Sequence, residues 1–440
     1  MMENKPTREA LLREFAPHLE RTTPVSVIWI LFLISVIGFG VYGFVAQVTK
    51  GHIVTGMRDN VVWGIYIVNF IFFMGMSYAG AIISGALHLF RTEWRKPIIR
   101  MAEYLAIISL LIGPGYILLC IGRLDRLHYL ALFGRIQSPI TWDVIAISTD
   151  IFGCLIFLYL SMLRDIANLR DFRELKLPVW RKKMYRILAL GYTGTPEQEV
   201  RLKRATDIMA AMVIAIAIIV YSVLAWIFSV TLQPGWHSTI FGPYFVIAAV
   251  YSGTAVLILI MWIYRKIYHL EHYITRKHFV AMGILMVVLA ALFGYFTFSD
   301  YLTKWYGSEK NDESLIRILF SDYYWPFIFS NYIGVMIPLI VVGIPRLRNI
   351  TNITISALIV VFALWFNRYL IVIPTLESPY LPIQDSRPDW TFYTATWVEY
   401  ALTSAGVALF CLLFTLASKF VPVMNVSEMA EPVKPEEPLL

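Results

Sequence analysis

The chain has 440 residues, of which 58% are hydrophobic and 15% charged, and its formal net charge is +7. Soluble globular proteins have about 45–50% apolar and 25% charged residues, so this composition excludes a soluble enzyme, a disordered chain and a disulfide-framed chain. In a membrane protein a positive net charge usually follows loop orientation, and the charge pattern gives no indication of a nucleic-acid partner.

Ten apolar runs are each long enough to cross about 30 Å of hydrocarbon as an α-helix. They predict an all-α membrane protein with ten transmembrane helices, because only helices satisfy their backbone polar groups in lipid without closing a barrel. We expect the first run to be a retained helix, because it is too long for a signal peptide and lacks a clear cleavage site. The runs cover residues 25–48, 61–90, 102–121, 140–163, 208–232, 240–264, 278–301, 323–344, 351–374 and 396–420.

Lys and Arg residues concentrate on one side of the predicted membrane. If the N-terminal segment 1–24 is cytoplasmic, the cytoplasmic segments hold 27 of the 37 Lys and Arg residues and the outer loops hold nine. This bias predicts a multi-pass plasma-membrane protein with both termini in the cytoplasm. We expect the basic connection 170–207 to hold an amphipathic helix near anionic lipid headgroups, and the Pro- and Glu-rich tail 426–440 to be disordered.

Paired motifs about 180 residues apart indicate an internal repeat. An Arg-Lys pair precedes the third and the seventh runs, at residues 95–96 and 276–277. A Gly-Tyr pair closes the same two runs, at residues 115–116 and 294–295. We therefore expect two four-helix bundles, formed by the second to fifth and the sixth to ninth runs, with the first and tenth runs flanking them. The corresponding halves of the chain are residues 25–232 and 233–425.

The cysteines and histidines do not form a ligand set for a resident redox centre. The three cysteines share no CxxC spacing, and an iron–sulfur cluster needs about four thiolates. Among the eight histidines only His88 lies clearly within an apolar run, whereas a haem between helices needs two facing imidazoles at matching depth. We expect no metal site, haem, flavin or iron–sulfur cluster in this chain.

Ionisable side chains within the apolar runs gather toward the predicted outer face, and such residues are costly in a bilayer and usually functional. Asp143 opens the fourth run, and Asp150 lies two turns deeper on the same helix face. One reading is a structural ion pair between Asp143 and Arg123. The other is a proton-handling site, since a carboxylate in apolar surroundings exchanges protons near neutral pH.

Several motifs resemble those of one membrane protein family. Over about residues 25–425 the chain resembles the NrfD/PsrC family of integral membrane subunits, and its nearest likeness is to the quinol-interacting subunits of alternative complex III. The stretch Pro-Gly-Trp-His-Ser-Thr-Ile-Phe at 234–241 is the most specific of these motifs. The others are Trp63–Tyr66, Arg100–Glu103, Gly122-Arg123, Ser138–Val144 and Gly242–Val246.

The resemblance implies a subunit of a respiratory oxidoreductase, not catalytic alone, that binds quinone or quinol (menaquinone or ubiquinone) near the outer face. Electrons would pass to or from an iron–sulfur subunit docked there. The resemblance also implies other membrane subunits, including a second homologous one, and a multihaem cytochrome or a molybdopterin subunit. It places Asp143 at a family carboxylate of the quinone pocket, Asp300 at an acidic position and Arg368 at a family arginine.

Within this framework we expect Asp143 to exchange a proton with the quinol and Arg123 to tune that carboxylate. Candidate quinone contacts are Asp143, His128, Tyr116, Tyr78 and Cys120. A proton path would use Asp150, Asp300, Asn331, Arg368 and His237. Family members often have His where this chain has Tyr78 and Cys120, and Glu where it has Asn367. These replacements remove groups that could relay protons, which makes quinone chemistry a stronger expectation than proton pumping.

A secondary transporter of a small solute is the alternative, because ten helices and an internal repeat are also found there. Transporters usually contain inverted repeats and paired mid-membrane breaks, whereas the repeat here is parallel. Purification would distinguish the two, since a transporter should be isolated alone and a respiratory subunit with a cluster-bearing partner.

Overall fold

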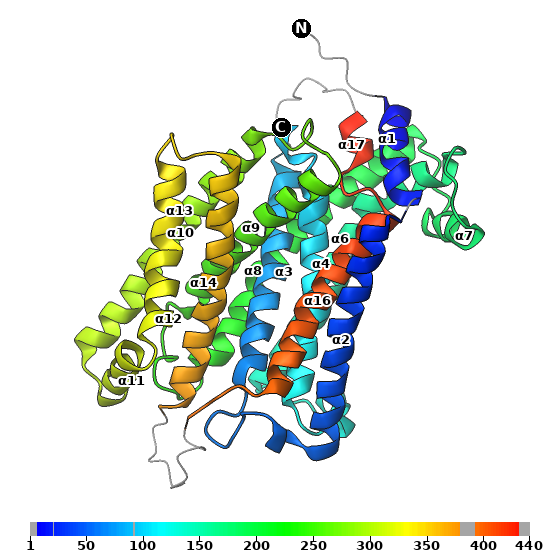
Figure 1. Ribbon diagram of the computed structural model, residues 1–440. Coiled ribbons are helices and arrows are strands. Elements are labelled where there is room, and N and C mark those ends of the chain that lie inside the picture. Colours follow the sequence, from blue (N-terminus) through cyan, green and yellow to red (C-terminus); the bar gives the residue numbers. More distant parts are fainter. Residues whose placement is uncertain (1–6, 21, 91–92, 379–391, 431–440) are drawn as a thin grey trace.

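The computed structural model describes residues 7–20, 22–90, 93–378 and 392–430, and every regular element in this part of the chain is a helix. Ten of these helices are long and apolar enough to cross a membrane, as the sequence predicted. Figure 1 shows that the first and last described helices, α1 (Arg8–Glu20) and α17 (Val426–Ala430), lie at one end of the helix assembly, which we call the terminal end. The ten spans are α2 (Pro24–Lys50), α3 (Gly64–Leu89), α4 (Ile99–Cys120), α6 (Pro139–Asp171), α8 (Pro196–Ser229), α9 (Phe241–Ile267), α10 (Arg276–Gly307), the α12–α13 span (Tyr324–Gly343), α14 (Ile350–Leu376) and α16 (Trp397–Phe420).

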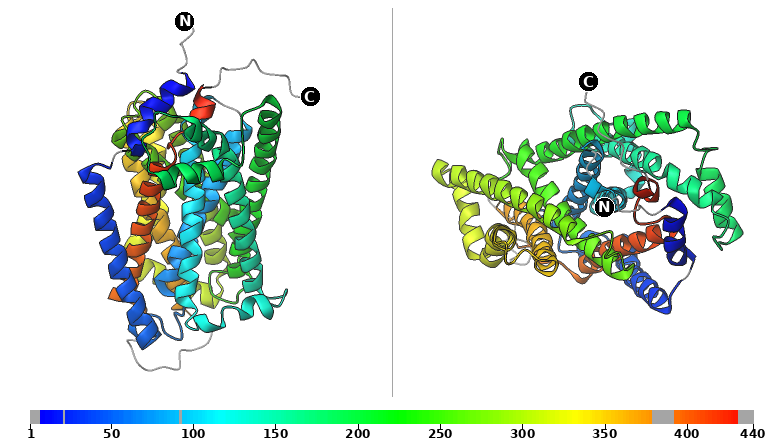
Figure 2. Two further views of the ribbon diagram at one scale, coloured as in Figure 1. Left: turned by 90° about the vertical axis from the view of Figure 1, so that its right-hand side faces the viewer. Right: turned by 90° about the horizontal axis from the view of Figure 1, so that it is seen from above.

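The spans form the two expected four-helix bundles. In the first bundle α3 packs on α4 and α8, and α6 packs on α4 and α8. In the second bundle α10 packs on α9 and α13, and α14 packs on the same two helices. The bundles meet where α3 contacts α9 and α14, while α2 and α16 pair along the flank, as the view from above shows (Figure 2). The interface between the bundles is therefore made mainly by α3, the most buried span, together with α8, which also packs on α9.

Two spans, α6 and α8, extend furthest beyond the apolar runs that predicted them. The α6 helix continues to Asp171, and α8 begins at Pro196, twelve residues before the apolar run that it contains. The side chain of Thr195 accepts a hydrogen bond from the backbone N–H of Gln198, which caps α8, and Pro196 occupies its first turn. These extensions carry polar residues, so a hydropathy window cannot detect them.

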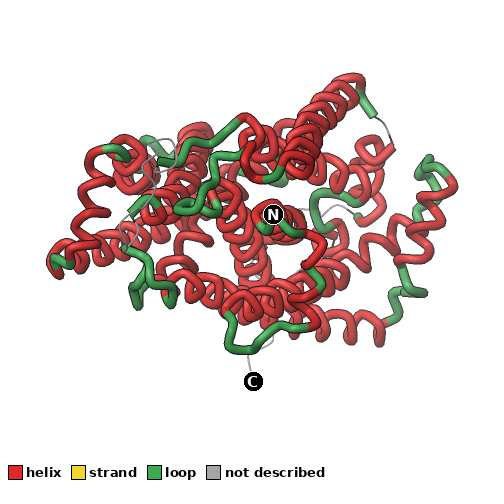
Figure 3. The backbone as a smooth tube through the Cα atoms, turned by 90° about the horizontal axis from the view of Figure 1, so that it is seen from below, coloured by secondary structure: helices red, strands yellow, loops and turns green. Residues whose placement is uncertain are grey.

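Short helices lie at the ends of the bundles, and the view from below shows only helices and loops in the described chain (Figure 3). At the terminal end lie α1 (Arg8–Glu20) and α7 (Val179–Leu188), and α7 confirms the helix expected within the basic connection. The sequence assigned residues 426–440 to a disordered tail, but residues 426–430 form the helix α17 (Val426–Ala430). This helix is ordered because its residues Val426 and Ser427 are buried against α1 and α6. Residues 431–440 lie outside the described part of the chain.

The eighth span contains one irregular turn. It begins as α12 (Tyr324–Ile328), passes through a π-helical turn (η4, Phe329–Ile333) and continues as α13 (Gly334–Gly343). A π-turn widens the helix locally and is frequent at functional sites. It carries Ser330 and Asn331, both buried, so the widened turn presents polar side chains to the interior of the second bundle.

Candidate functional site

Two buried carboxylates of α6 face the interior of the first bundle. Asp143 lies one turn after the start of the helix and is 9% exposed, and Asp150 is completely buried two turns further on. Asp150 accepts a hydrogen bond from the thiol of Cys154 at 3.4 Å through Oδ1. Oδ1 of Asp143 and Oδ2 of Asp150 are buried without a protein hydrogen-bond partner. Both residues therefore have an oxygen that can accept a proton or a hydrogen bond.

Tyr78 of α3 faces the same interior. Its side chain is 1% exposed, its hydroxyl has no protein partner, and the carboxylates of Asp150 and Asp143 are the acidic charges that act on it. The small residues around it allow the helices to approach closely, because a Cβ on Gly80 would stand 2.6 Å from the backbone of Ala102. The structure thus brings together three predicted site residues, Asp143, Asp150 and Tyr78.

The expected pairing of Arg123 with Asp143 is wrong. Arg123 forms an ion pair of 2.9 Å with Asp125, and both side chains are more than half exposed. Arg123 immediately precedes the short helix η3 (Leu124–Arg126) and Asp125 lies within it, so the two residues meet within one turn. The hydrogen bond and charge of Arg123 lower the pKa of Asp125. The Arg123 guanidinium therefore pairs with the neighbouring Asp125 and not with the buried Asp143.

Two of the other three predicted quinone contacts are hydrogen-bonded elsewhere, and the third, His128, is exposed. The Tyr116 hydroxyl donates to the carbonyls of Leu402 and Thr403 at 3.3 Å, so it faces α16 rather than α6. The thiol of Cys120 donates to the carbonyl of Trp63 at 3.7 Å. His128 is exposed and packs its ring edge-on against the following residue. The structure does not place these three residues in the group formed by Asp143, Asp150 and Tyr78.

In the second bundle a buried arginine lies beside an asparagine and a phenylalanine ring. Arg368 of α14 is 1% exposed, and no described residue forms an ion pair with it. Its Nη1 donates to Oδ1 of Asn367 at 3.3 Å, and its guanidinium lies 5.1 Å from the centre of the Phe245 ring. Nδ2 of Asn367 donates to the Tyr244 hydroxyl at 2.8 Å. An isolated buried cation is costly, so this position is a functional candidate.

A cavity of about 500 Å³ opens at the end opposite the termini, between the end of α8, the loop from α8 to α9, and α10. It is lined by Ser229, His237, Ser238, Thr239, Ile240, Ser299, Asp300 and Thr303. Asp300 forms an ion pair with Lys304, whose ammonium also donates to the carbonyl of Gly235 at 2.7 Å. Oδ1 of Asp300 is buried without a protein partner. The structure thus joins two residues of the predicted proton path, Asp300 and His237, at one polar cavity.

Asn331 lies in the π-helical turn of the second bundle, apart from this cavity's lining. Its amide oxygen and nitrogen are both buried without a protein partner. Within the described residues no group of three or more His, Cys, Asp and Glu side chains is arranged to hold a metal ion.

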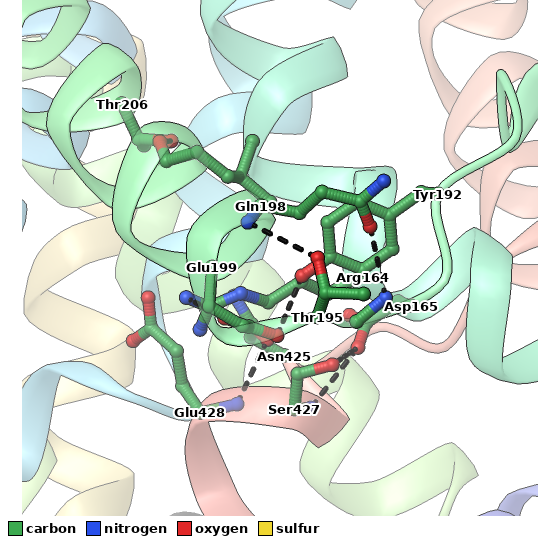
Figure 4. A network of polar contacts seen from close by, with 12 residues as sticks. Arg164, Asp165, Tyr192, Thr195, Gln198, Glu199, Thr206, Asn425, Ser427 and Glu428 are labelled. Atoms are coloured by element: carbon green, nitrogen blue, oxygen red, sulfur yellow. Dashed lines mark hydrogen bonds and ion pairs between the residues drawn. The ribbon is translucent and has the colours of Figure 1, made fainter.

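Sequence reasoning missed a buried ionic cluster at the terminal end. Arg100 of α4 lies 3.0 Å from Asp165 of α6 and 3.5 Å from Glu103. Ser427 of α17 donates to Asp165 through its backbone N–H and its hydroxyl, as Figure 4 shows. An Arg and a Glu three positions apart are too common in helices to identify such a cluster from sequence.

Arg164, which precedes Asp165 on α6, forms a second ionic contact at the same end. It pairs with Glu199 of α8, and Glu199 also accepts a hydrogen bond from the Tyr192 hydroxyl at 2.5 Å (Figure 4). This contact joins the polar ends of α6 and α8, the extensions that the hydropathy pattern did not include.

A second polar cluster that the sequence did not predict lies at the end opposite the termini. Glu399 is completely buried and accepts hydrogen bonds from Tyr393 at 2.5 Å and from the backbone N–H of Gly56 at 2.6 Å. It also caps α16 by accepting from the backbone N–H of Thr396 at 2.9 Å. The Thr-x-x-Glu pattern of a capping box is visible in the sequence and could have predicted this role. Both carboxylate oxygens of Glu399 therefore already accept hydrogen bonds, and they hold the segments around Gly56 and Tyr393 to the start of α16.

Comparisons with known proteins agree with the fold. The family model described as polysulphide reductase, NrfD, matches residues 53–378. The chain is 24% identical to a Halobacterium salinarum protein named as a membrane subunit of dimethyl sulfoxide reductase, with 90% of this chain and 91% of that protein aligned. It is 24% identical to the Hdr-like menaquinol oxidoreductase integral membrane subunit of Archaeoglobus fulgidus, over 91% of this chain and 95% of the relative. It is 20% identical to a selenate reductase subunit of Mesobacillus selenatarsenatis, over 90% and 93%.

The family match covers most of the chain, from the loop after α2 to the end of α14, and so includes both bundles. The relatives named above align over nearly their full lengths and are named as subunits of reductases or of a menaquinol oxidoreductase. With its ten apolar spans, the chain is an integral membrane protein that belongs to the polysulphide reductase NrfD family.

Proposed function

We propose that this chain is the quinol-interacting membrane subunit of a respiratory oxidoreductase complex. It exchanges electrons with an iron–sulfur partner at the end opposite its termini. The Lys and Arg bias supports an outer position for that end, because the segments at the terminal end are the basic ones. The family match and the menaquinol named for the Archaeoglobus fulgidus relative support quinol as the substrate.

The proposed site depends on one observation, the buried and unpartnered carboxylate oxygen of Asp143. Asp143 lies near the opposite end of the first bundle, is nearly buried, and has a carboxylate oxygen without a protein partner. Oxidation of a quinol releases two electrons and two protons, so a site for it needs a base close to the hydroxyl groups. In this proposal Asp143 accepts a quinol proton, Asp150 and Tyr78 adjoin it, and the electrons pass to the partner cluster.

Some of the expected quinone-site residues are excluded from the proposed site because their polar groups already have partners in the protein. Tyr116 and Cys120 already donate to backbone carbonyls, and Arg123 is exposed and paired with Asp125. His128 remains a proposed contact from the loop at the same end. The proposed core of the site is therefore Asp143, Asp150 and Tyr78.

The test is Asp143→Asn in the assembled complex, with quinol oxidation measured in membranes. We expect turnover to fall by about 10²-fold, a typical loss for an acid–base group, while the subunit still assembles. Asp125→Asn is the matched control, because this exposed carboxylate lies at the same end and should leave turnover unchanged. Wild-type turnover in Asp143→Asn would refute the assignment. Isolation of the wild-type chain without any cluster-bearing partner would refute the proposed subunit role.

A further inference from the structure

The cavity of about 500 Å³ at the end opposite the termini has a polar lining that the proposed function does not use. Its volume is within the range of sites that bind small molecules, but such sites are usually lined by apolar and aromatic side chains. Here seven of the eight described lining residues carry a hydroxyl, carboxylate or imidazole group, and Ile240 is the exception. The lining therefore favours a ligand rich in hydrogen-bonding groups over the ring of a quinone.

The polar atoms of this lining are mainly hydrogen-bond acceptors. The hydroxyls of Ser229, Ser299 and Thr303 donate to backbone carbonyls of their own helices at distances between 2.9 and 3.4 Å, so their lone pairs remain available. Asp300 is 7% exposed, and its Oδ1 is buried without a hydrogen-bond partner among the described residues. A ligand that uses these acceptors must bring donors, which are hydroxyl or ammonium groups.

Lys304 balances the charge of Asp300, which favours a neutral ligand. The two side chains form an ion pair, and each is 9% exposed. The Lys304 ammonium also donates to the carbonyl of Gly235 at 2.7 Å and lies 5.6 Å from the ring centre of Phe241. A charged ligand beside this pair would leave one unbalanced charge in a partly buried site, which is costly. Hydroxyl groups therefore fit the site better than ammonium groups.

The loop between α8 and α9 is held in place beside the cavity. Trp236 is 1% exposed, donates from its indole N–H to the carbonyl of Ile371 at 2.6 Å, and stacks on Trp63. The backbone N–H of Gly235 donates to Oδ1 of Asp312 at 3.1 Å. The cavity is therefore formed before a ligand arrives, which lowers the entropic cost of binding.

The cavity shares one side of α8 and α10 with side chains that face the lipid. Trp226 lies one turn before Ser229, and Tyr295 lies one turn before Ser299, so each pair is on one helix face. Trp226 is 49% exposed and Tyr295 is 63% exposed. Ser229 and Ser299 also lie within one turn of the ends of their apolar runs, where aromatic side chains mark the level of the lipid headgroups. The polar cavity is therefore at headgroup depth, next to the surface that acyl chains cover.

We propose that this cavity binds the neutral hydroxylated headgroup of a membrane lipid, a sugar attached to diacylglycerol. The headgroup hydroxyls donate to Oδ1 of Asp300 and to the hydroxyl oxygens of the lining, and the acyl chains lie beside Trp226 and Tyr295. The described lining contains no residue of α6, so this site is separate from the proposed quinol site. The proposal does not depend on the function proposed above.

The test measures lipid binding by native mass spectrometry of the full chain in a detergent without a sugar headgroup. The probes are monoglucosyl-diacylglycerol and phosphatidylcholine with the same acyl chains, because the phosphocholine headgroup has no hydrogen-bond donor. We expect one glucosyl lipid to be retained with about tenfold higher affinity than phosphatidylcholine, the effect of one or two net hydrogen bonds. Equal affinity for the two lipids would overturn the proposal.

Two variants locate the bound lipid. Asp300→Asn should weaken binding of the glucosyl lipid by about tenfold, because the charged acceptor is lost. The double variant Ser229→Ala with Ser299→Ala leaves the Asp300–Lys304 ion pair intact and should weaken binding by about threefold or more. Ser222→Ala is the matched control, since Ser222 lies two turns before Ser229, donates to its own helix at 2.7 Å and is outside the lining. Wild-type binding in both cavity variants would overturn the proposal.

Competition distinguishes the lipid from other ligands with hydroxyl groups. Methyl glucoside, a soluble sugar, should not displace the glucosyl lipid at equal concentration, because it lacks the acyl chains. Menaquinol should not displace it either, because its ring does not fit a polar lining. Displacement by either compound at equal concentration would overturn the assignment to a sugar lipid.

Discussion

Arg100 and Asp165 form an ion pair of 3.0 Å between α4 and α6, and both side chains are almost completely buried. Asp165 also receives the backbone N–H of Ser427 at 3.0 Å and its hydroxyl at 2.7 Å. Hydrogen bonds to the buried Asp165 carboxylate therefore hold the helix α17 against the first bundle. Since Arg95 also pairs with Glu428 at 3.4 Å, one ion pair and two hydrogen bonds to a buried carboxylate hold the same short helix.

We predict that Asp165→Asn destabilises the protein by about 3 kcal/mol, the lower end of the cost of breaking a buried ion pair. The cost is at the lower end because Glu103 still faces the Arg100 guanidinium. The measurement is the midpoint of thermal denaturation in detergent. Glu174→Gln is the control, since its pair with Arg13 is exposed to solvent and should change the thermal midpoint much less. An equal shift in both variants would contradict the prediction.

Gly80 provides a test of the contact between α3 and α4. A Cβ at this position would stand 2.6 Å from the carbonyl oxygen of Ala102 and from the amide nitrogen of Ala106. Because backbone atoms cannot move aside as a flexible side chain can, Gly80→Ala should separate the helices and cost about 1–3 kcal/mol. Gly115→Ala on α4 is the matched control, since nothing lies within 4 Å of its Cβ position. The thermal midpoints of the two variants check this prediction, which fails if Gly80→Ala is as stable as Gly115→Ala.

His18 should make the docking of α1 sensitive to pH. Its ring packs edge-on against Tyr268 at 4.8 Å, and burial, together with the nearby charge of Lys419, lowers its pKa. The undocked histidine therefore binds a proton more readily than the docked one. Docking is fully favourable above the ordinary histidine pKa of about 6.5 and weakens as the pH falls below it.

Hydrogen exchange of residues 8–20, corrected for the intrinsic rate at each pH, measures this effect. We expect the protection of α1 to decrease between pH 7.5 and pH 5. His18→Phe keeps an aromatic ring against Tyr268 but does not titrate, so it should abolish the decrease. A decrease of the same size in His18→Phe would assign the pH effect to another group.

The fold was predictable because the membrane restricts which backbone structures are stable. Long apolar runs determine where the spans are, and a repeat of simple motifs was enough to group eight of them into two bundles. The ends of α6 and α8 were not predictable in this way, because their final turns are polar and leave the apolar region. The order of residues 426–430 was missed because it depends on Asp165, a residue 262 positions away from Ser427.

The site was predictable only in part, because a sequence indicates the depth of a polar residue better than its partner. Asp143 and Asp150 were found from their spacing on one helix. The expected partner of Arg123, Asp143, was wrong. Arg123 pairs with Asp125 because a residue two positions away in the chain reaches it more easily than one on another helix. Tyr244 gave no signal, since it is one of 25 tyrosines and only helix packing places its hydroxyl beside the amide of Asn367.

The helix α7 presents two different faces, which indicates how it meets the membrane. On one face Arg181 donates to the Tyr185 hydroxyl at 3.0 Å and to the carbonyl of Leu19 at 2.9 Å. Tyr185 donates to the carbonyl of Phe420 at 2.6 Å, so this face is fixed to the protein. The outer face exposes apolar and basic side chains together, namely Val179, Trp180, Lys182, Lys183, Arg186 and Ile187. Such a combination favours the interface of an anionic leaflet.

We predict that replacing Lys182, Lys183 and Arg186 by Gln weakens the retention of anionic phospholipids by about fivefold for each charge. Each basic residue near an anionic surface contributes about 1 kcal/mol, and this contribution is lost when the charge is removed. Native mass spectrometry of the protein from mixed micelles measures the retained lipid. Lys310→Gln with Arg317→Gln is the control, because these basic residues of α11 (Lys310–Ser321) lie at the opposite end and should not change retention. Equal lipid retention in the α7 variant and the wild type would show that its basic face does not bind the anionic surface.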